Sequence, residues 1–205
     1  GAVNAVAFSP DGHDLATAGV DGVVQIWDAT TKQVRLTIPG RQSAINDVAF
    51  SPNGRWLATV SDDGYTKLWD IANATDPEEM FDRMGHNEKV KSVTFSRDGR
   101  RLATSGFDGA IKIWSLAAPS FGLPLTTISD PAERLITYAL AFSPDGARLA
   151  TGRVDGTIAL WDLASSQKVL TFPGHKANVF ALAFSPDGSQ LLTGAFDSVK
   201  IWDST

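Results

Sequence analysis

The side chains that could do chemistry in this chain fall into two sets of the same composition, each with one histidine, threonine, aspartate and tryptophan. The sets are His86, Thr104, Asp108 and Trp114, and His175, Thr193, Asp197 and Trp202. Histidine, a hydroxyl and aspartate are the groups from which a nucleophile, its general base and an orienting carboxylate are built. A catalytic site occurs once and opens to a cleft, whereas this group is repeated. We therefore interpret both sets as structural and expect no enzymatic activity.

Both sets belong to a longer pattern that occurs five times along the chain. Phe-Ser-x-x-Gly begins at Phe8, Phe50, Phe95, Phe142 and Phe184. A tryptophan closes each copy, at Trp27, Trp69, Trp114, Trp161 and Trp202. Self-similarity with a period of 42 to 47 residues predicts a repeat architecture before any single motif is considered. The chain is thus one domain, 1–205, with repeats at about 1–39, 40–84, 85–128, 129–173 and 174–205.

The first repeat contains four short apolar runs separated by turn signals. The runs are Ala2–Phe8, Leu15–Gly19, Val23–Trp27 and Gln33–Ile38. Ser-Pro-Asp-Gly and Asp-Gly are typical of tight turns, because Pro fixes φ and Gly accepts a positive φ. Each repeat therefore predicts a four-stranded antiparallel meander, with strands called a, b, c and d. Because the strands are apolar almost throughout, we expect both faces of each sheet to be covered by neighbouring copies, as in a propeller or a solenoid.

The direction of the strands sorts the loops onto two opposite faces. Strands in a meander alternate in direction, so the a–b and c–d links lie at one end of the sheet. The b–c hairpins and the segments leading into each strand a lie at the other end, which we call the hairpin face. The longest lead-in segment, Ser129–Leu135, precedes the fourth strand a.

Composition narrows the classes of function. The 205-residue chain has a formal net charge of −5 with acidic and basic residues interspersed, so nothing indicates binding to nucleic acid or to an anionic membrane. No cysteine is present, which excludes disulfides and zinc-thiolate sites. We expect no signal peptide and no membrane-spanning segment, since no apolar run in the sequence is long enough to span a bilayer. We expect no metal site and no cofactor.

The pattern resembles the WD-repeat family of β-propellers, in a bacterial style of repeat. The resemblance covers essentially the whole chain and rests on Gly85-His86, Gly174-His175, the strand-b threonines, the hairpin aspartates and the closing Trp-Asp pairs at 27–28, 69–70, 161–162 and 202–203. It implies that each histidine set forms a hydrogen-bonded tetrad joining strands b and c to the lead-in segment. Departures from the pattern are Arg41 and Glu133 at two histidine positions, Ser115 in place of the last aspartate of the third repeat, and a fifth hairpin, at Asp197-Ser198, that is one residue short. We expect the fifth blade to be the least regular, with a tighter turn or a bulge absorbing the deletion.

Counting strands gives four complete meanders and a fifth that ends after strand c. We therefore expect a last blade without its outer strand. We also expect the five blades to be part of a larger ring, the alternative being a five-bladed propeller that closes by itself.

The resemblance implies a cytoplasmic, non-catalytic scaffold or sensor domain that binds a protein partner on the hairpin face. The alternative is a gating or accessory propeller of a larger enzyme, an NTPase, kinase or peptidase, whose partners include other domains of the same chain. The family's contact positions on this face hold Lys89, Lys91, Phe107, Ile136, Tyr138, Val154, Asn178, Phe180 and Phe196. An aromatic and apolar cluster bordered by lysines is typical of a binding hot spot. The competing interpretation is that some of these aromatic side chains pack under the lead-in segment Ser129–Leu135.

Overall fold

The computed structural model of the protein describes residues 1–39, 42–73, 76–118, 120–129 and 135–204. Within these ranges the chain forms nineteen β-strands in five antiparallel sheets. Each sheet corresponds to one repeat and is called a blade below. No described segment is a helix long and apolar enough to cross a membrane. The prediction of an all-β propeller arrangement built from meanders is confirmed.

Within every blade the strands lie side by side in the order of the sequence. Blade 1 contains β1 (Val3–Phe8), β2 (Asp14–Gly19), β3 (Val23–Asp28) and β4 (Val34–Pro39). Blade 2 contains β5 (Ile45–Phe50), β6 (Trp56–Ser61), β7 (Tyr65–Asp70) and β8 (Glu78–Met84). Blade 3 contains β9 (Val90–Phe95), β10 (Arg101–Gly106), β11 (Ala110–Ser115) and β12 (Pro124–Ser129). Blade 4 contains β13 (Thr137–Phe142), β14 (Arg148–Arg153), β15 (Thr157–Asp162) and β16 (Gln167–Pro173). Blade 5 contains β17 (Val179–Phe184), β18 (Gln190–Ala195) and β19 (Val199–Asp203), so the predicted absence of an outer strand is also confirmed.

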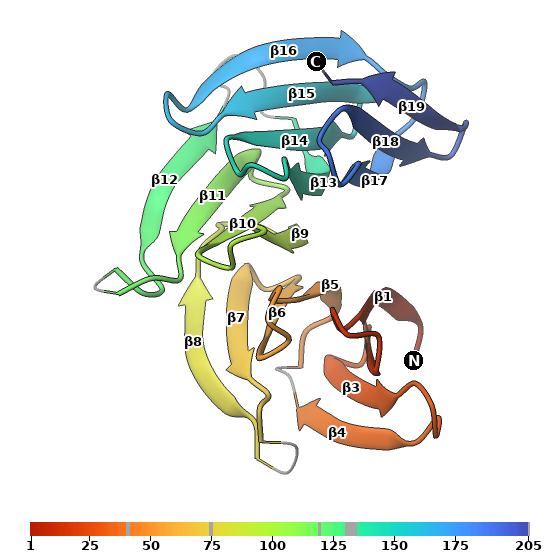
Figure 1. Ribbon diagram of the computed structural model, residues 1–205, viewed down its shortest axis with the longest axis vertical. Helices are drawn as coiled ribbons and strands as arrows, with labels where there is room; N and C mark the ends of the chain where they lie inside the picture. The colour runs from red at the N-terminus through yellow and green to blue at the C-terminus, as the bar shows by residue number, and fades with distance from the viewer. Residues whose placement is uncertain (40–41, 74–75, 119, 130–134, 205) are drawn as a thin grey trace.

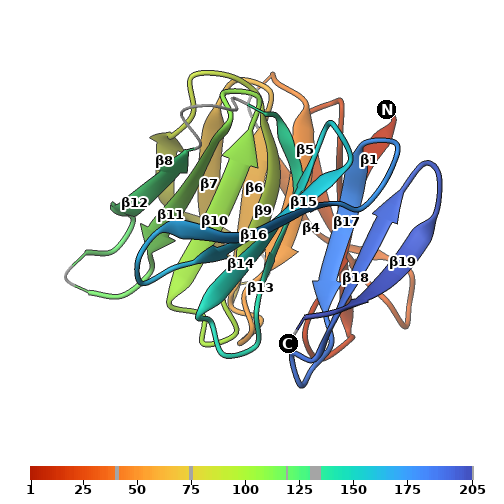
Figure 2. The ribbon, with the colours of Figure 1, turned by 90° about the horizontal axis from the view of Figure 1, so that it is seen from above.

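The five blades are arranged as an arc around their innermost strands (Figure 1). Strands β1, β5, β9, β13 and β17 line the inside of the arc, and each contacts the next. The sheets are twisted, as the view at right angles shows (Figure 2). Blades 1 and 5 stand at the two ends of the arc, which is open between them in Figure 1. One face of each end blade is therefore not covered by a neighbouring blade.

The a–b turns are held by a serine that bonds in two directions. In blade 1 the Ser9 hydroxyl donates to Asp11 at 2.6 Å, while its oxygen accepts from the backbone N–H of Asp14 at 2.8 Å. Gly12 closes the turn with its N–H 2.9 Å from the Ser9 carbonyl, at a φ of 74°. That conformation is open to glycine and strained for other residues, which explains the invariant last position of the repeated turn within this chain.

The short hairpin of blade 5 keeps its register by tightening the turn. In blade 1 the last paired residues before the hairpin are Ala18 and Val24, and in blade 5 they are Gly194 and Val199. The Ala195 N–H donates to the Ser198 carbonyl at 3.0 Å, which closes a tighter turn across the deletion. The strands on either side therefore pair as in the other blades, and no side chain changes face.

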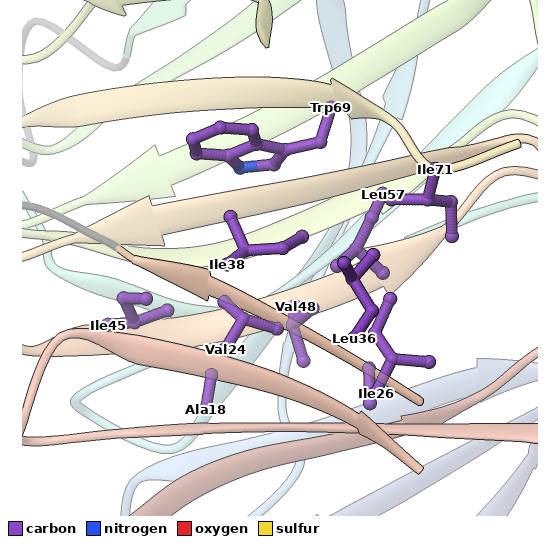
Figure 3. Packing of buried hydrophobic residues seen from close by; sticks show 11 residues of the cluster. Ala18, Val24, Ile26, Leu36, Ile38, Ile45, Val48, Leu57, Trp69 and Ile71 are labelled. Atoms are coloured by element: carbon purple, nitrogen blue, oxygen red, sulfur yellow. The ribbon is translucent and has the colours of Figure 1, made fainter. Parts of the chain in front are cut away.

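Each blade has two different apolar faces. The front face carries the large residues of strand a and the closing tryptophan, for example Val48 and Trp69 in blade 2. The back face carries small residues of strand b and aliphatic residues of strand c, for example Val24 and Ile26 in blade 1. The back of blade 1 packs on the front of blade 2, as Figure 3 shows, and the same pairing recurs up to blade 5. Burial of each such side chain contributes about 1.5–3 kcal/mol, so these interfaces are the main stabilising element of the array.

One position on the apolar back face of blade 2 holds a polar residue, which makes it possible to test the packing. Thr66 of blade 2 is fully buried and its hydroxyl has no hydrogen-bond partner among the described residues, whereas Val24 stands at the same position of blade 1. Replacing Thr66 by valine is expected to raise the free energy of unfolding by about 1 kcal/mol, because an unpaired buried hydroxyl is removed without a change of shape. Urea denaturation measures the effect. The matched control is Thr104→Val, which removes a bonded hydroxyl and is expected to destabilise; a loss of stability in both variants would contradict the prediction.

Candidate binding face and the histidine tetrads

The first histidine set is assembled from four separate elements of blade 3 and its lead-in segment. His86 lies between β8 and β9, Thr104 on β10, Asp108 in the following hairpin and Trp114 on β11. The His86 Nδ1 is 2.9 Å from Asp108, its Nε2 is 2.9 Å from the Thr104 hydroxyl, and the Trp114 N–H donates to that hydroxyl at 3.0 Å. The indole can only donate, so the hydroxyl accepts from it and is free to donate its own hydrogen to Nε2. This network places the imidazole proton on Nδ1, facing the carboxylate.

The Asp108 carboxylate is held ionised by this geometry. Burial opposes its ionisation, but the hydrogen bond from His86 and the N–H groups of Ala110 and Asn87 together lower its pKa below the ordinary value. The hairpin of blade 3 is thereby tied to the segment leading into β9.

The second set forms the same arrangement at the end of the array. The His175 Nδ1 is 2.9 Å from Asp197, its Nε2 is 2.7 Å from the Thr193 hydroxyl, and the Trp202 N–H donates to Thr193 at 2.9 Å. The shorter hairpin thus leaves the tetrad intact. Asp197 also accepts the Lys176 N–H at 3.1 Å, which joins the hairpin to the segment leading into β17.

Both tetrads are closed to a substrate. The histidine side chains have no exposed surface, and both threonines are fully buried. A nucleophile has to reach a reacting atom, which a covered hydroxyl cannot do. Among the described residues, no three acidic or histidine side chains are grouped so that they could hold a metal ion.

In blades 1, 2 and 4 the described residues form part of the same network. The indole N–H still donates to the strand-b threonine from Trp27, Trp69 and Trp161, at 3.0, 3.4 and 3.2 Å. In blade 4 the hairpin aspartate, Asp155, accepts instead from Thr157 within its own loop, at 2.6 Å. The predicted substitutions at the histidine position, Arg41 and Glu133, lie outside the described residues.

The aromatic residues of the candidate site form a continuous row along the hairpin face of blades 3 to 5. We call this the aromatic row: Phe107, Tyr138, Phe180 and Phe196. Successive ring centroids are 6.0, 5.1 and 4.8 Å apart, with tilted or edge-to-face geometry. Phe180 and Phe196 are 43% and 84% exposed, which is unusual for side chains of this size. The sequence analysis expected these residues to form one aromatic and apolar cluster, and in the structure their rings follow one another in contact.

A charged cluster adjoins the Phe107 end of the row. The Lys91 ammonium lies 5.2 Å from the Phe107 ring centroid and donates to Asn46 and Asp62 of blade 2, at 2.8 and 3.0 Å. Lys89 donates to the other oxygen of Asp62 at 2.6 Å. Burial opposes ionisation of Asp62, but hydrogen bonds from Lys89, Asn46 and Lys91 hold its pKa at about 2. The ammonium groups of both predicted lysines therefore already have hydrogen-bond partners in blade 2.

Asn46 and Asp62 occupy the same contact positions in the second repeat, where the residues are small or polar, and the predicted set does not include them. Both residues are recognisably polar in the sequence. Their hydrogen bonds to Lys89 and Lys91, however, join two blades through residues 27 to 45 positions apart in the chain. Nothing in the local spacing indicates such a pair.

The remaining predicted residues lie beside the row. The Val154 N–H donates to the Ile136 carbonyl at 2.9 Å, and both side chains are half-buried, as is Asn178. The proposed cover of the row, Ser129–Leu135, falls largely on residues 130–134, which are outside the described part of the chain. Packing of the row under that segment stays a prediction.

Inside the arc, next to the row, is a hollow of about 450 Å³. It is lined by Asn4, Ala5, Val6, Asn46, Asp47, Lys91, Ser92, Tyr138 and Phe180. Asp47 accepts the N–H groups of Val48 and of Val93 in the next blade, each at 2.9 Å. Burial nevertheless raises the pKa of Asp47 to about 6. The lining of the hollow thus includes both a carboxylate with a raised pKa and the rings of Tyr138 and Phe180.

A search of curated proteins gives no match, whereas a protein-family model matches each of the five blades. The family model described as WD domain, G-beta repeat, matches residues 1–28, 32–70, 79–115, 122–162 and 166–203. These five segments cover most of the chain, and each includes the strands of one blade up to its closing tryptophan. Propellers of this family are commonly scaffolds for protein interaction and are typically non-catalytic. The five-bladed chain described above therefore belongs to the WD40 repeat family.

Proposed function

We propose that this chain is a non-catalytic platform that binds a protein partner on its hairpin face. The observation that carries the proposal is the aromatic row, in which four rings from three blades are in contact and Phe180 and Phe196 are 43% and 84% exposed. Aromatic side chains gathered on an exposed surface are the usual anchors of a protein interface. The buried tetrads support the proposal because they fix the hairpins that carry Phe107 and Phe196.

The side chains in and around the aromatic row indicate what kind of partner segment could bind there. The rings offer apolar surface with little conformational entropy to lose on binding. The Lys89 side chain is 48% exposed while its ammonium is paired with Asp62, so it forms a polar rim at one end. A partner that lays apolar side chains on the rings and turns polar groups toward this rim matches the surface.

The double replacement Tyr138→Ala with Phe180→Ala tests the proposal. Peptides are first selected from a displayed random library for binding to the unaltered protein, and their affinities are then measured by fluorescence anisotropy. The double variant is expected to bind them at least about thirtyfold more weakly, because the loss of even one hot-spot anchor costs about 2 kcal/mol. The melting curve is expected to be little changed.

The matched control removes two apolar side chains elsewhere. Leu125 and Val169 lie on the outer strands β12 and β16 and are each 53% exposed. The double variant Leu125→Ala with Val169→Ala is expected to bind the selected peptides as well as the unaltered protein does. Equal affinity of both double variants would show that the row is not the binding surface.

A further inference from the structure

Two lysine ammonium groups at the Phe107 end of the aromatic row share one carboxylate. The Lys89 ammonium donates to one oxygen of Asp62 at 2.6 Å, and the Lys91 ammonium donates to the other oxygen at 3.0 Å. Burial opposes ionisation of Asp62, but hydrogen bonds from both lysines and from Asn46 hold its pKa at about 2. The carboxylate is therefore fully ionised at neutral pH, and two positive charges face one negative charge.

The other carboxylates of this region have donors of their own. Asp47 accepts two backbone N–H groups, Asp63 accepts a serine hydroxyl of its own blade, and Asp108 accepts from the tetrad histidine. Glu88 is exposed. Within the described part of the chain, no carboxylate other than that of Asp62 lies at ion-pair distance from either lysine. One positive charge is thus left without a carboxylate among the described residues.

The same two ammonium groups have hydrogen-bond donors to spare. Each lysine has three N–H donors. Lys89 uses one on Asp62, and Lys91 uses two, one on Asp62 and one on Asn46, so three of the six remain for solvent or a ligand. The Lys89 side chain is 48% exposed, which makes its donors accessible from outside. A carboxylate has two oxygens and can accept from both ammonium groups at once.

The spare charge lies directly beside apolar surface. The Lys91 ammonium is 5.2 Å from the ring centroid of Phe107, and that centroid is 6.0 Å from the centroid of Tyr138. In an extended segment every second side chain points to the same side, at a spacing of about 7 Å. A segment that brings a side chain to the lysines therefore brings the side chain two positions away onto the rings.

We propose that the segment bound by the aromatic row carries an acidic side chain that pairs with Lys89 and Lys91, two positions from an apolar side chain that packs on the rings. This inference rests on the proposed function, because it takes the row as the apolar part of the same site. An acidic group balances the two ammonium charges, whereas a basic group meets an excess of positive charge. The pair lies at the junction of blades 2 and 3, whose inner strands also contact those of blades 1 and 4.

The peptides selected from a displayed random library for binding to the unaltered protein provide the first test. Most are expected to contain Asp or Glu two positions from an aromatic or aliphatic residue. Replacing that acid by its amide in one such peptide is expected to weaken binding about fivefold, as measured by fluorescence anisotropy, because one partly exposed ion pair is lost. The Lys89→Gln protein is expected to show the same loss with the acidic peptide and almost none with the amide peptide, as a double-mutant cycle requires for a direct contact.

The chain offers a matched control on the same face. Lys176 is exposed and lies in the segment leading into β17, beyond the other end of the row. Lys176→Gln changes the net charge by the same amount as Lys89→Gln and is expected to leave the affinity for the acidic peptide unchanged. Lys89→Arg, which keeps the charge, is expected to retain most of the affinity. Thermal melting of each variant verifies that the fold is intact.

The inference is overturned if the selected peptides lack the acidic residue or if Lys89→Gln binds the acidic peptide as tightly as the unaltered protein does. An equal loss for the acidic and amide peptides, or an equal loss in Lys176→Gln, also overturns it. Failure of the proposed function has a different sign, namely unchanged binding to the Tyr138→Ala with Phe180→Ala protein. A library that yields no binding peptide contradicts both.

Discussion

Replacing His86 by alanine is expected to lower the free energy of unfolding by about 3 kcal/mol. The side chain is fully buried and bonds both Asp108 and Thr104, so its removal leaves a cavity, a hydroxyl with one partner fewer and a carboxylate without its main donor. The loss should be concentrated in blade 3, because the network ties its hairpin to the segment leading into β9. Chemical denaturation followed by tryptophan fluorescence measures the change.

The chain supplies a matched control in its third histidine. His13 is exposed and follows the first a–b turn, so His13→Ala is expected to change the free energy of unfolding by less than about 0.5 kcal/mol. Equal stabilities of the His86→Ala and His13→Ala proteins would mean that the tetrad contributes little beyond the packing of its members.

Deprotonation of Asp47 is expected to weaken the fold as pH rises. Burial raises its pKa from the ordinary 3.8 to about 6, so between these values the folded state binds the proton more tightly than the unfolded state. Its unfavourable contribution therefore grows through this window and is complete above about pH 6. Asp47→Asn removes the titration. Relative to the unaltered protein, the free energy of unfolding of the variant should rise by about 1–3 kcal/mol between about pH 4 and pH 7.5. We expect a value near the lower end of this range because the Asp47 side chain is only half-buried.

The change of this difference with pH, measured by urea denaturation at several pH values, is the test. The absolute difference in the free energy of unfolding is a poorer measure. It also includes the weakening of the hydrogen bonds from Val48 and Val93, which an amide accepts less well than a carboxylate. The control is Asp187, whose pKa is lowered to about 2 by hydrogen bonds from Ser185 and Ser189. Its contribution is present above pH 3.8 and lost as pH falls toward 2, so Asp187→Asn should show a flat difference where Asp47→Asn shows a rising one. A flat difference for Asp47→Asn would contradict the predicted burial of its charge.

The histidine tetrads and the hydrogen bonds of Asp47 both help to fix the position of the hairpin face. The tetrads hold the hairpins from below, so the rings of Phe107 and Phe196 stand on backbone whose position is fixed. Asp47 bonds the backbone of the next inner strand and so contributes to the spacing between blades 2 and 3. A surface built on rigid elements loses little entropy when it binds, which favours a platform over an adaptable loop.

The sequence by itself was sufficient for the fold and for the tetrads. The period of the Phe-Ser-x-x-Gly pattern predicted the blades, and the turn residues predicted the meander within each blade. The members of a tetrad lie within one repeat and its lead-in segment, so their spacing is set by local strand pairing. For the short hairpin of blade 5 the sequence left two outcomes open, a tighter turn or a bulge, because register follows from the length of a turn; the structure has the tighter turn.

Contacts between blades were decided only by the tertiary structure. The bonds from Lys89 and Lys91 to Asp62 join residues of adjacent blades, and the spacing between two sheets leaves no trace in the pattern of either repeat. The raised pKa of Asp47 likewise depends on how closely the next inner strand covers it.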